Sequence, residues 1–191
     1  MNNSTITESG EKLLTTRNLV MCAVLTALTA VLSQLSIPLP SQIPITLQTF
    51  AVALCGYMLG SRLGSVSLIV YALLGAVGVP VFAGFSGGLG AIAGYTGGYI
   101  IGFIPMAFLC GLGTELNNKA LLAVLSLAGL AICHLLGTIW FSIVSGTSLL
   151  SSFMVASVPY LVKDIVSVVC AYFIALAVKK ALRKARLGTA D

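Results

Sequence analysis

The adjacent residues Lys163 and Asp164 are the side chains best suited to hold a polar ligand. They stand in an otherwise apolar segment, residues 158–166, whereas every other charge lies in a terminal tail or a short polar break. A charge within membrane hydrocarbon costs about 2.5–3.5 kcal/mol on insertion scales. The pair therefore predicts either a ligand-holding cavity or an internal contact that locks helix packing. Sequence neighbours lie about 100° apart around a helix, so we expect the two to face differently, with Asp164 the stronger ligand candidate.

The composition is that of an integral membrane protein. Of the 191 residues, 58% are hydrophobic and 8% are charged, and the mean hydropathy is +1.07. A soluble domain carries about 25% charged residues. The formal net charge of +5 comes from cations at the ends of apolar runs. That distribution predicts membrane topology and excludes a nucleic-acid surface.

Catalytic and metal-binding patterns are missing from the sequence. The five cysteines are scattered without CxxC spacing, which indicates buried, inert thiols. His134 is the only histidine, and we expect it to be a helix-packing residue. The chain lacks the phosphate-loop motif of ATPases, so it does not hydrolyse ATP itself. We expect no catalytic residues, no metal and no cofactor.

Six apolar runs predict an all-α bundle of six transmembrane helices. They cover about residues 19–35, 46–60, 63–79, 92–112, 120–144 and 159–180. The domain organisation is then a polar tail (1–18), a membrane domain (19–180) and a basic tail (181–191). The second run reaches only about 22 Å at 1.5 Å per residue, which is short for a core of about 30 Å.

The cations predict the orientation of this bundle. Six spans put both termini on one side, and all cations except Lys163 fall there: Lys12, Arg17, Arg62, Lys119 and the cluster at 179–186. The opposite loops, near 36–45, 80–91 and 145–157, carry no charge. Both termini are therefore expected in the cytoplasm. Asp164 then lies about five residues, or roughly 7 Å, inside the outer end of its helix, so its site opens outward.

Several further residues at the outer end are ligand candidates. Ten of the twenty glycines fall between residues 75 and 102. Gly90, Gly94, Gly98 and Gly102 predict close helix packing, whereas the amides of the 84–90 stretch could approach a ligand. The remaining candidates can be either pocket residues or packing and interfacial anchors. Together the outer-end candidates are Tyr95, Thr96, Phe85, Ser86, Gly88, Gln48 and Tyr160.

Small residues mark one face of the first predicted helix. Ala23, Ala27 and Ala30 recur at helical spacing. A helix face made of such small side chains allows another helix to approach closely. The approaching helix is either part of this chain or part of a separate subunit.

A string of short motifs runs along the chain: PITLQT (44–49), LGSRLG (59–64), GVPVFAG (78–84), SGG (86–88), TGGY (96–99) and GF (102–103). Together these motifs resemble the BioY family, the biotin-specific substrate-binding (S) components of energy-coupling factor (ECF) transporters. The resemblance implies a multi-pass protein of a prokaryotic cell membrane that captures biotin at the outer face. It also implies docking, through Ala23 and Ala27, to a transmembrane coupling (T) protein driven by two cytosolic ATPases.

One departure from the family pattern concerns the charged pair. The family places a glycine before the aspartate and a lysine three residues after it, where this chain has Lys163 and Ser167. We expect Asp164 to accept a ureido N–H bond from biotin. Lys163, or amides of the 84–88 stretch, would face the ligand carboxylate. The alternatives are a solitary biotin facilitator, a membrane-embedded enzyme using Asp164 and His134, and a purely structural subunit.

Overall fold

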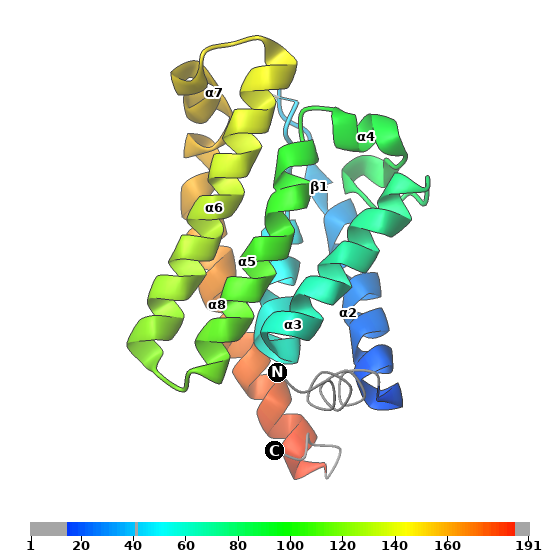
Figure 1. Cartoon of the computed structure of the whole chain (residues 1–191), viewed down its shortest axis with the longest axis vertical. Coiled ribbons are helices and arrows are strands. Elements are labelled where there is room, and N and C mark those ends of the chain that lie inside the picture. The colour runs from blue at the N-terminus through cyan, green and yellow to red at the C-terminus, as the bar shows by residue number, and fades with distance from the viewer. Residues whose placement is uncertain (1–14, 41, 186–191) are drawn as a thin grey trace, which may run out of the picture.

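A computed structural model describes residues 15–40 and 42–185, which form a bundle of long helices (Figure 1). The helices are α2 (Thr16–Gln34), α3 (Gln48–Ala76), α4 (Leu89–Ala93), α5 (Gly97–Glu115), α6 (Lys119–Ser145), α7 (Leu149–Ala156) and α8 (Val158–Lys184). A 3-10 turn, η1 (Ala83–Phe85), precedes α4. Strands β1 (Ser36–Ile37) and β2 (Ile45–Thr46) pair antiparallel, with Ser36 opposite Thr46.

Helix α3 is a hairpin of two helical segments, residues 48–59 and 61–76. Gly60 has φ 80° and ψ −177°, which interrupts the helix in a region that glycine tolerates. Gln48 Nε2 donates to the Tyr71 hydroxyl at 2.7 Å. These residues would lie about 35 Å apart along one continuous helix. The two segments therefore run back along each other.

The described residues thus contain six long helical segments, because α3 has two arms, whereas five whole helices are long and apolar enough to cross a membrane. The second and third predicted runs are the two arms of α3. The turn of this hairpin is at Gly60, and residues 61–64 already belong to its second arm. The prediction of an all-α membrane protein is confirmed, because most of the described residues are helical and five helices are long and apolar enough to cross a membrane.

Two outer segments differ from the predicted loops and helix boundaries. The fourth long helix begins at Gly97 instead of near residue 92, because Gly94 is extended and separates α4 from α5. Gly90 and Gly94 thus lie outside α5, whereas Gly98 and Gly102 lie within it. The segment after α6 contains a short helix, α7, rather than an open loop, with Ser148 capping its first turn.

Glycines allow α5 and α6 to meet backbone to backbone. A Cβ atom on Gly102 would lie 2.9 Å from Cys133 Cα, and one on Gly129 would lie 3.2 Å from Met106 Cα. A Cβ on Gly98 would lie 2.5 Å from the Leu136 carbonyl oxygen. Contacts this close leave no room for side chains between the helices. The expected packing role of Gly98 and Gly102 is therefore confirmed.

The inward face of α2 is polar and hydrogen-bonded. Thr26 Oγ1 lies 2.9 Å from Ser67 Oγ and donates to the Ser67 carbonyl at 3.1 Å. Ser33 Oγ donates to the Val81 carbonyl at 2.5 Å. Apolar residues such as Val24 and Val31 point outward instead. In lipid, burial of apolar surface does not drive helices together, so hydroxyl bonds and small residues assume that role.

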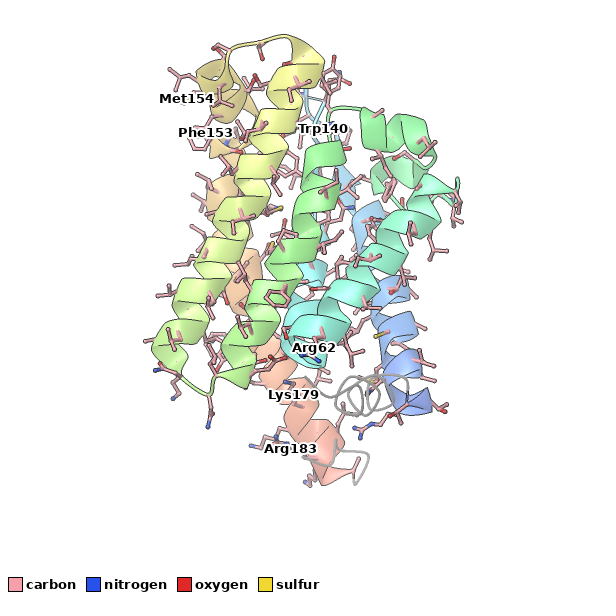
Figure 2. All side chains as sticks on the ribbon, in the orientation of Figure 1. Arg62, Trp140, Phe153, Met154, Lys179 and Arg183 are labelled. Atoms are coloured by element: carbon pink, nitrogen blue, oxygen red, sulfur yellow. The ribbon has the colours of Figure 1, made fainter. Side chains whose placement is uncertain are left out.

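Cationic and aromatic side chains gather at opposite ends of the bundle. Arg62, Lys179 and Arg183 lie at one end, and Trp140 and Phe153 lie at the other (Figure 2). The first turn of α2 and the last turn of α8 share the cationic end (Figure 1). Two positions used in the sequence argument, Lys12 and Arg186, fall outside the described residues, as do most of the two predicted tails.

Glu115 closes the hairpin of α3 from a neighbouring helix. Its carboxylate accepts the Ser61 backbone N–H at 2.6 Å and the Ser61 hydroxyl at 2.9 Å. Ser61 begins the second arm, where backbone N–H groups lack partners within the helix. Glu115 thus caps that arm across 54 residues of chain.

The close packing of α5 on α6 predicts that Gly102→Ala destabilises the protein. The added methyl group pushes against the α6 backbone, and overpacking of this kind costs about 1–3 kcal/mol. We expect the melting temperature in detergent to fall by several degrees. Gly90→Ala is the matched control, because a Cβ atom at that position would have no other atom within 4 Å. Equal melting temperatures for the two variants would contradict this interface.

The cap of α3 predicts that Glu115→Ala lowers stability by about 0.5–2 kcal/mol, the range seen for lost helix caps. Ser61→Ala removes the hydroxyl half of the same interaction. Because the two residues share one contact, the double variant should lose less than the sum of the single losses in thermal unfolding. Strict additivity would show that Glu115 acts independently of Ser61.

Candidate ligand-binding site

A cavity of about 190 Å³ lies near the end of the bundle that carries α4 and α7. Its walls come from the first arm of α3, from α5, α6 and α8, and from two connecting segments at 42–44 and 82–86. The lining residues are Gln42, Ile43, Pro44, Thr46, Gln48, Thr49, Phe82, Ala83, Ser86, Thr96, Tyr99, Ile100, Phe103, Leu130, Cys133, His134, Ala156, Tyr160, Lys163 and Asp164.

Asp164 is the buried charge of this cavity, with 5% of its surface exposed. Its Oδ2 lies 3.2 Å from His134 Nε2, on the facing helix α6. Because an ionised carboxylate can only accept, Nε2 is the donor in this contact. Oδ1 is ion-paired with Lys163. A carboxylate oxygen has two lone pairs, so Oδ1 can accept a further hydrogen bond beside this ion pair.

Lys163 reaches the same cavity as its neighbour. Its ammonium group pairs with Asp164 and donates to the Thr46 carbonyl at 3.0 Å. The expectation that Lys163 faces elsewhere is therefore wrong. The two Cα–Cβ directions do diverge on a helix, but the four-carbon lysine stem is long enough to bend back. The pair is at once an internal ion pair and part of the cavity wall.

His134 is fixed by a cluster of hydroxyl groups centred on Ser157. Ser157 Oγ lies 3.1 Å from His134 Nδ1, 2.8 Å from Thr138 Oγ1 and 3.1 Å from the Tyr99 hydroxyl. Tyr99 also donates to the Ala156 carbonyl at 2.5 Å. Both ring nitrogens of His134 are thus engaged, which sets the orientation of the imidazole toward Asp164.

Aromatic side chains form the apolar part of the wall and anchor its loops. Tyr160 donates to the Ile43 carbonyl at 2.5 Å, which ties the proline-rich 38–44 connection to α8. Tyr71 packs edge-on against Phe82 and donates to the Val81 carbonyl at 2.9 Å. The cavity is therefore bounded by side chains whose positions are set by hydrogen bonds.

Six of the nine predicted ligand-binding residues line this cavity: Asp164, Lys163, Gln48, Thr96, Ser86 and Tyr160. Three lie outside its lining. Tyr95 is 37% exposed and packs against Phe141, and Phe85 is 71% exposed. Gly88 donates its N–H to the Gly75 carbonyl at 2.6 Å, which holds the glycine-rich turn against α3.

The most important residue that sequence reasoning did not place in the site is His134. It was expected to pack between helices, and it does so, but it also contacts Asp164. A buried carboxylate in lipid needs a donor, and this requirement could have singled out the only histidine of a neighbouring span. Tyr99, Thr49 and Phe103 also line the cavity without having been predicted.

The alanine positions of α2 are divided between two environments. Ala23 and Ala27 are exposed, whereas Ala30 is partly buried and packs against the core. The two exposed alanines lie outside the buried hydroxyl face at Thr26 and Thr29. Within the described residues, no helix of this chain covers that pair, which leaves room for a partner.

The arrangement suits binding better than bond-breaking chemistry. One end of the cavity offers a carboxylate oxygen with spare accepting capacity, and Lys163 offers an ammonium group nearby. Among residues 15–40 and 42–185, no group of three His, Cys, Asp or Glu side chains could hold a metal ion. A ligand with N–H donors, an apolar body and an anionic group would complement these walls.

Comparisons with known proteins agree with this geometry. The BioY family model matches residues 3–184. The probable biotin transporter BioY of Pyrococcus horikoshii is 41% identical over 155 residues, covering 81% of this chain and 91% of its own. The biotin transporter BioY of Thermotoga maritima is 39% identical over 165 residues, covering 86% and 96%.

A solved structure shares the fold over nearly its whole length. The crystal structure of the S-component for biotin from an ECF-type ABC transporter superposes with a TM-score of 0.77 at 26% identity. The match covers 94% of this chain and 95% of that one. The family match, the two transporter relatives and this shared fold together show that the chain belongs to the BioY family.

Proposed function

We propose that this chain is the biotin-binding S component of an ECF transporter, with biotin as the transported ligand and not as a cofactor. Membership of the BioY family makes it a transport protein and not an enzyme. The observation that carries the proposal is the cavity around Asp164, in which a buried carboxylate retains an oxygen able to accept a hydrogen bond.

The chemistry of biotin matches the polar groups and the aromatic walls of this cavity. Its ureido ring carries two N–H donors, and its flexible tail ends in a carboxylate. In the proposed complex, Asp164 accepts a ureido N–H bond, and the ring rests against aromatic walls such as Tyr99 and Phe103. Lys163 then meets the tail carboxylate. Two amides of the glycine-rich turn, Phe85 and Gly88, already donate to Gln34 and Gly75, which favours Lys163 for this role.

The proposed topology places the cavity toward the outside of a prokaryotic cell membrane. The six long segments cross the bilayer, with both termini in the cytoplasm, and residues 19–180 form the membrane domain between the tails at 1–18 and 181–191. Support comes from the position of Arg62, Lys179 and Arg183 at the end opposite the cavity (Figure 2).

The proposed partners are a transmembrane T protein and two cytosolic ATPases. The exposed pair Ala23 and Ala27 on α2 would receive the T protein, while Ala30 supports that face from the core side. Untagged partners that co-purify with the chain would support this assembly. Biotin uptake by cells that express the chain without those partners would instead indicate a solitary facilitator.

Asp164→Asn is expected to weaken biotin binding by about ten- to a hundred-fold. Asparagine keeps the shape but loses the charge, and hydrogen bonds to charged groups contribute about 1.5–3 kcal/mol. Calorimetric titration of the detergent-purified protein, with native mass spectrometry for stoichiometry, measures the effect. Ser167→Ala, on the same helix but outside the cavity lining, is the control. Unchanged affinity in Asp164→Asn would remove this residue from the site.

The variant Lys163→Gln tests whether Lys163 binds the carboxylate end of the ligand. If Lys163 meets the tail carboxylate, the variant should lose about ten-fold or more in affinity for biotin, since a charge-assisted contact disappears. It should lose little for biotinamide, in which the carboxylate is replaced by a neutral amide. Equal losses for both ligands would show that Lys163 acts only by holding Asp164.

A further inference from the structure

A second cavity, of about 570 Å³, lies at the cationic end of the bundle. It is formed by the turn between α5 and α6 and by the last turns of α8. Its lining residues are Gly113, Thr114, Asn117, Asn118, Lys119, Leu122, Tyr172, Leu176, Lys179, Lys180 and Arg183. We call this cavity the basic groove. It shares no lining residue with the cavity around Asp164.

The basic groove has a strong excess of positive charge. Four of its lining residues are cations, and none is a carboxylate. The described part of the chain holds only two carboxylates, Asp164 and Glu115. Asp164 is in the other cavity, and Glu115 is near the groove but directs both oxygens to Ser61. Among the described residues, the lining of the groove itself thus consists of cations, neutral polar side chains and apolar side chains.

Lys179 shows this imbalance most clearly. Its side chain is partly buried between α8 and the α5–α6 turn, yet within residues 15–40 and 42–185 it has no ion pair. A partly buried ammonium group is stabilised by an anion placed beside it. An anion in the groove would restore the charge balance.

Another part of the groove lining is apolar and continues onto the surface. Leu122, Tyr172 and Leu176 line it, and Leu176 is 46% exposed. Phe173, next to Tyr172, is also exposed. A ligand that fits both walls has an anionic head beside an apolar chain. A free phosphate ion would use only the cationic wall.

We propose that the basic groove binds an anionic phospholipid, with the phosphate beside Lys179 and Arg183 and an acyl chain along Leu176 and Tyr172. Basic pockets between membrane helices on the cytoplasmic side hold such headgroups in other proteins. Topology alone accounts for cations at this end of the bundle. It does not account for four of them around one cavity with an apolar wall.

The test compares lipid binding to the full-length protein by native mass spectrometry. Phosphatidylglycerol and phosphatidylcholine with identical acyl chains are titrated separately into the delipidated, detergent-purified protein. The double variant Lys179→Gln/Arg183→Gln should bind phosphatidylglycerol about ten- to thirty-fold more weakly, given the contribution of each cation near an anionic headgroup. Inorganic phosphate at millimolar concentration should not displace the lipid, because it cannot use the apolar wall.

The matched control is Arg17→Gln/Lys184→Gln, which removes the same charge at the same end but outside the groove lining. It should retain wild-type lipid binding. Equal weakening in both double variants, or equal affinity of the wild type for the two lipids, would overturn the proposal. Displacement by phosphate would assign the groove to a free anion instead. A melting curve for each variant verifies folding, and none of these results depends on biotin binding.

Discussion

The contact between Asp164 and His134 is the interaction on which the cavity depends. A carboxylate buried among apolar helices is costly unless it is paired and hydrogen-bonded. His134 supplies a donor from α6 and Lys163 supplies the opposite charge from α8 itself. Lys163 in turn holds the Thr46 carbonyl at the end of β2, and Ser157 orients His134 from the start of α8. One buried charge thereby fixes two helices and a connecting strand around the same space.

The rest of the bundle forms a close-packed frame for that space. Helices α5 and α6 meet through Gly102 and Gly129, and the arms of α3 meet through Gly56 and Gly64. Such contacts need no apolar driving force, which lipid does not provide between helices. They draw the backbones together, while the bulky side chains of Tyr99, Phe103 and Tyr160 line the cavity.

The sequence predicts the helical segments well because their lengths and breaks are local properties. The turn at Gly60 and the start of α8 near Pro159 follow from the residues at those positions. The role of His134 and the direction of Lys163 depend on contacts across the fold: His134 is thirty positions from Asp164, and Lys163 is 117 from Thr46. The ligand role of Tyr95 stays a prediction: Tyr95 is outside the cavity lining, follows the extended residue Gly94 and packs its ring against Phe141.

The two cavities differ in charge: the cavity around Asp164 contains an ion pair, whereas the lining of the basic groove contains four cations. In the cavity around Asp164, Lys163 already has an anionic partner and a carbonyl partner. The carboxylate of an incoming biotin would therefore replace Asp164 or the Thr46 carbonyl as a partner of Lys163. The ureido N–H group would then bond to the Asp164 oxygen that Lys163 had left. In the proposed complex, the ureido ring and the tail carboxylate would thus depend on each other through the Lys163–Asp164 ion pair. A molecule with only one of these two groups would leave one of the buried charges without a partner. The described lining of the basic groove holds four cations and no carboxylate, so its charge favours an anionic ligand. The first cavity is suited to selecting a ligand, and the second to retaining any lipid that carries the required charge.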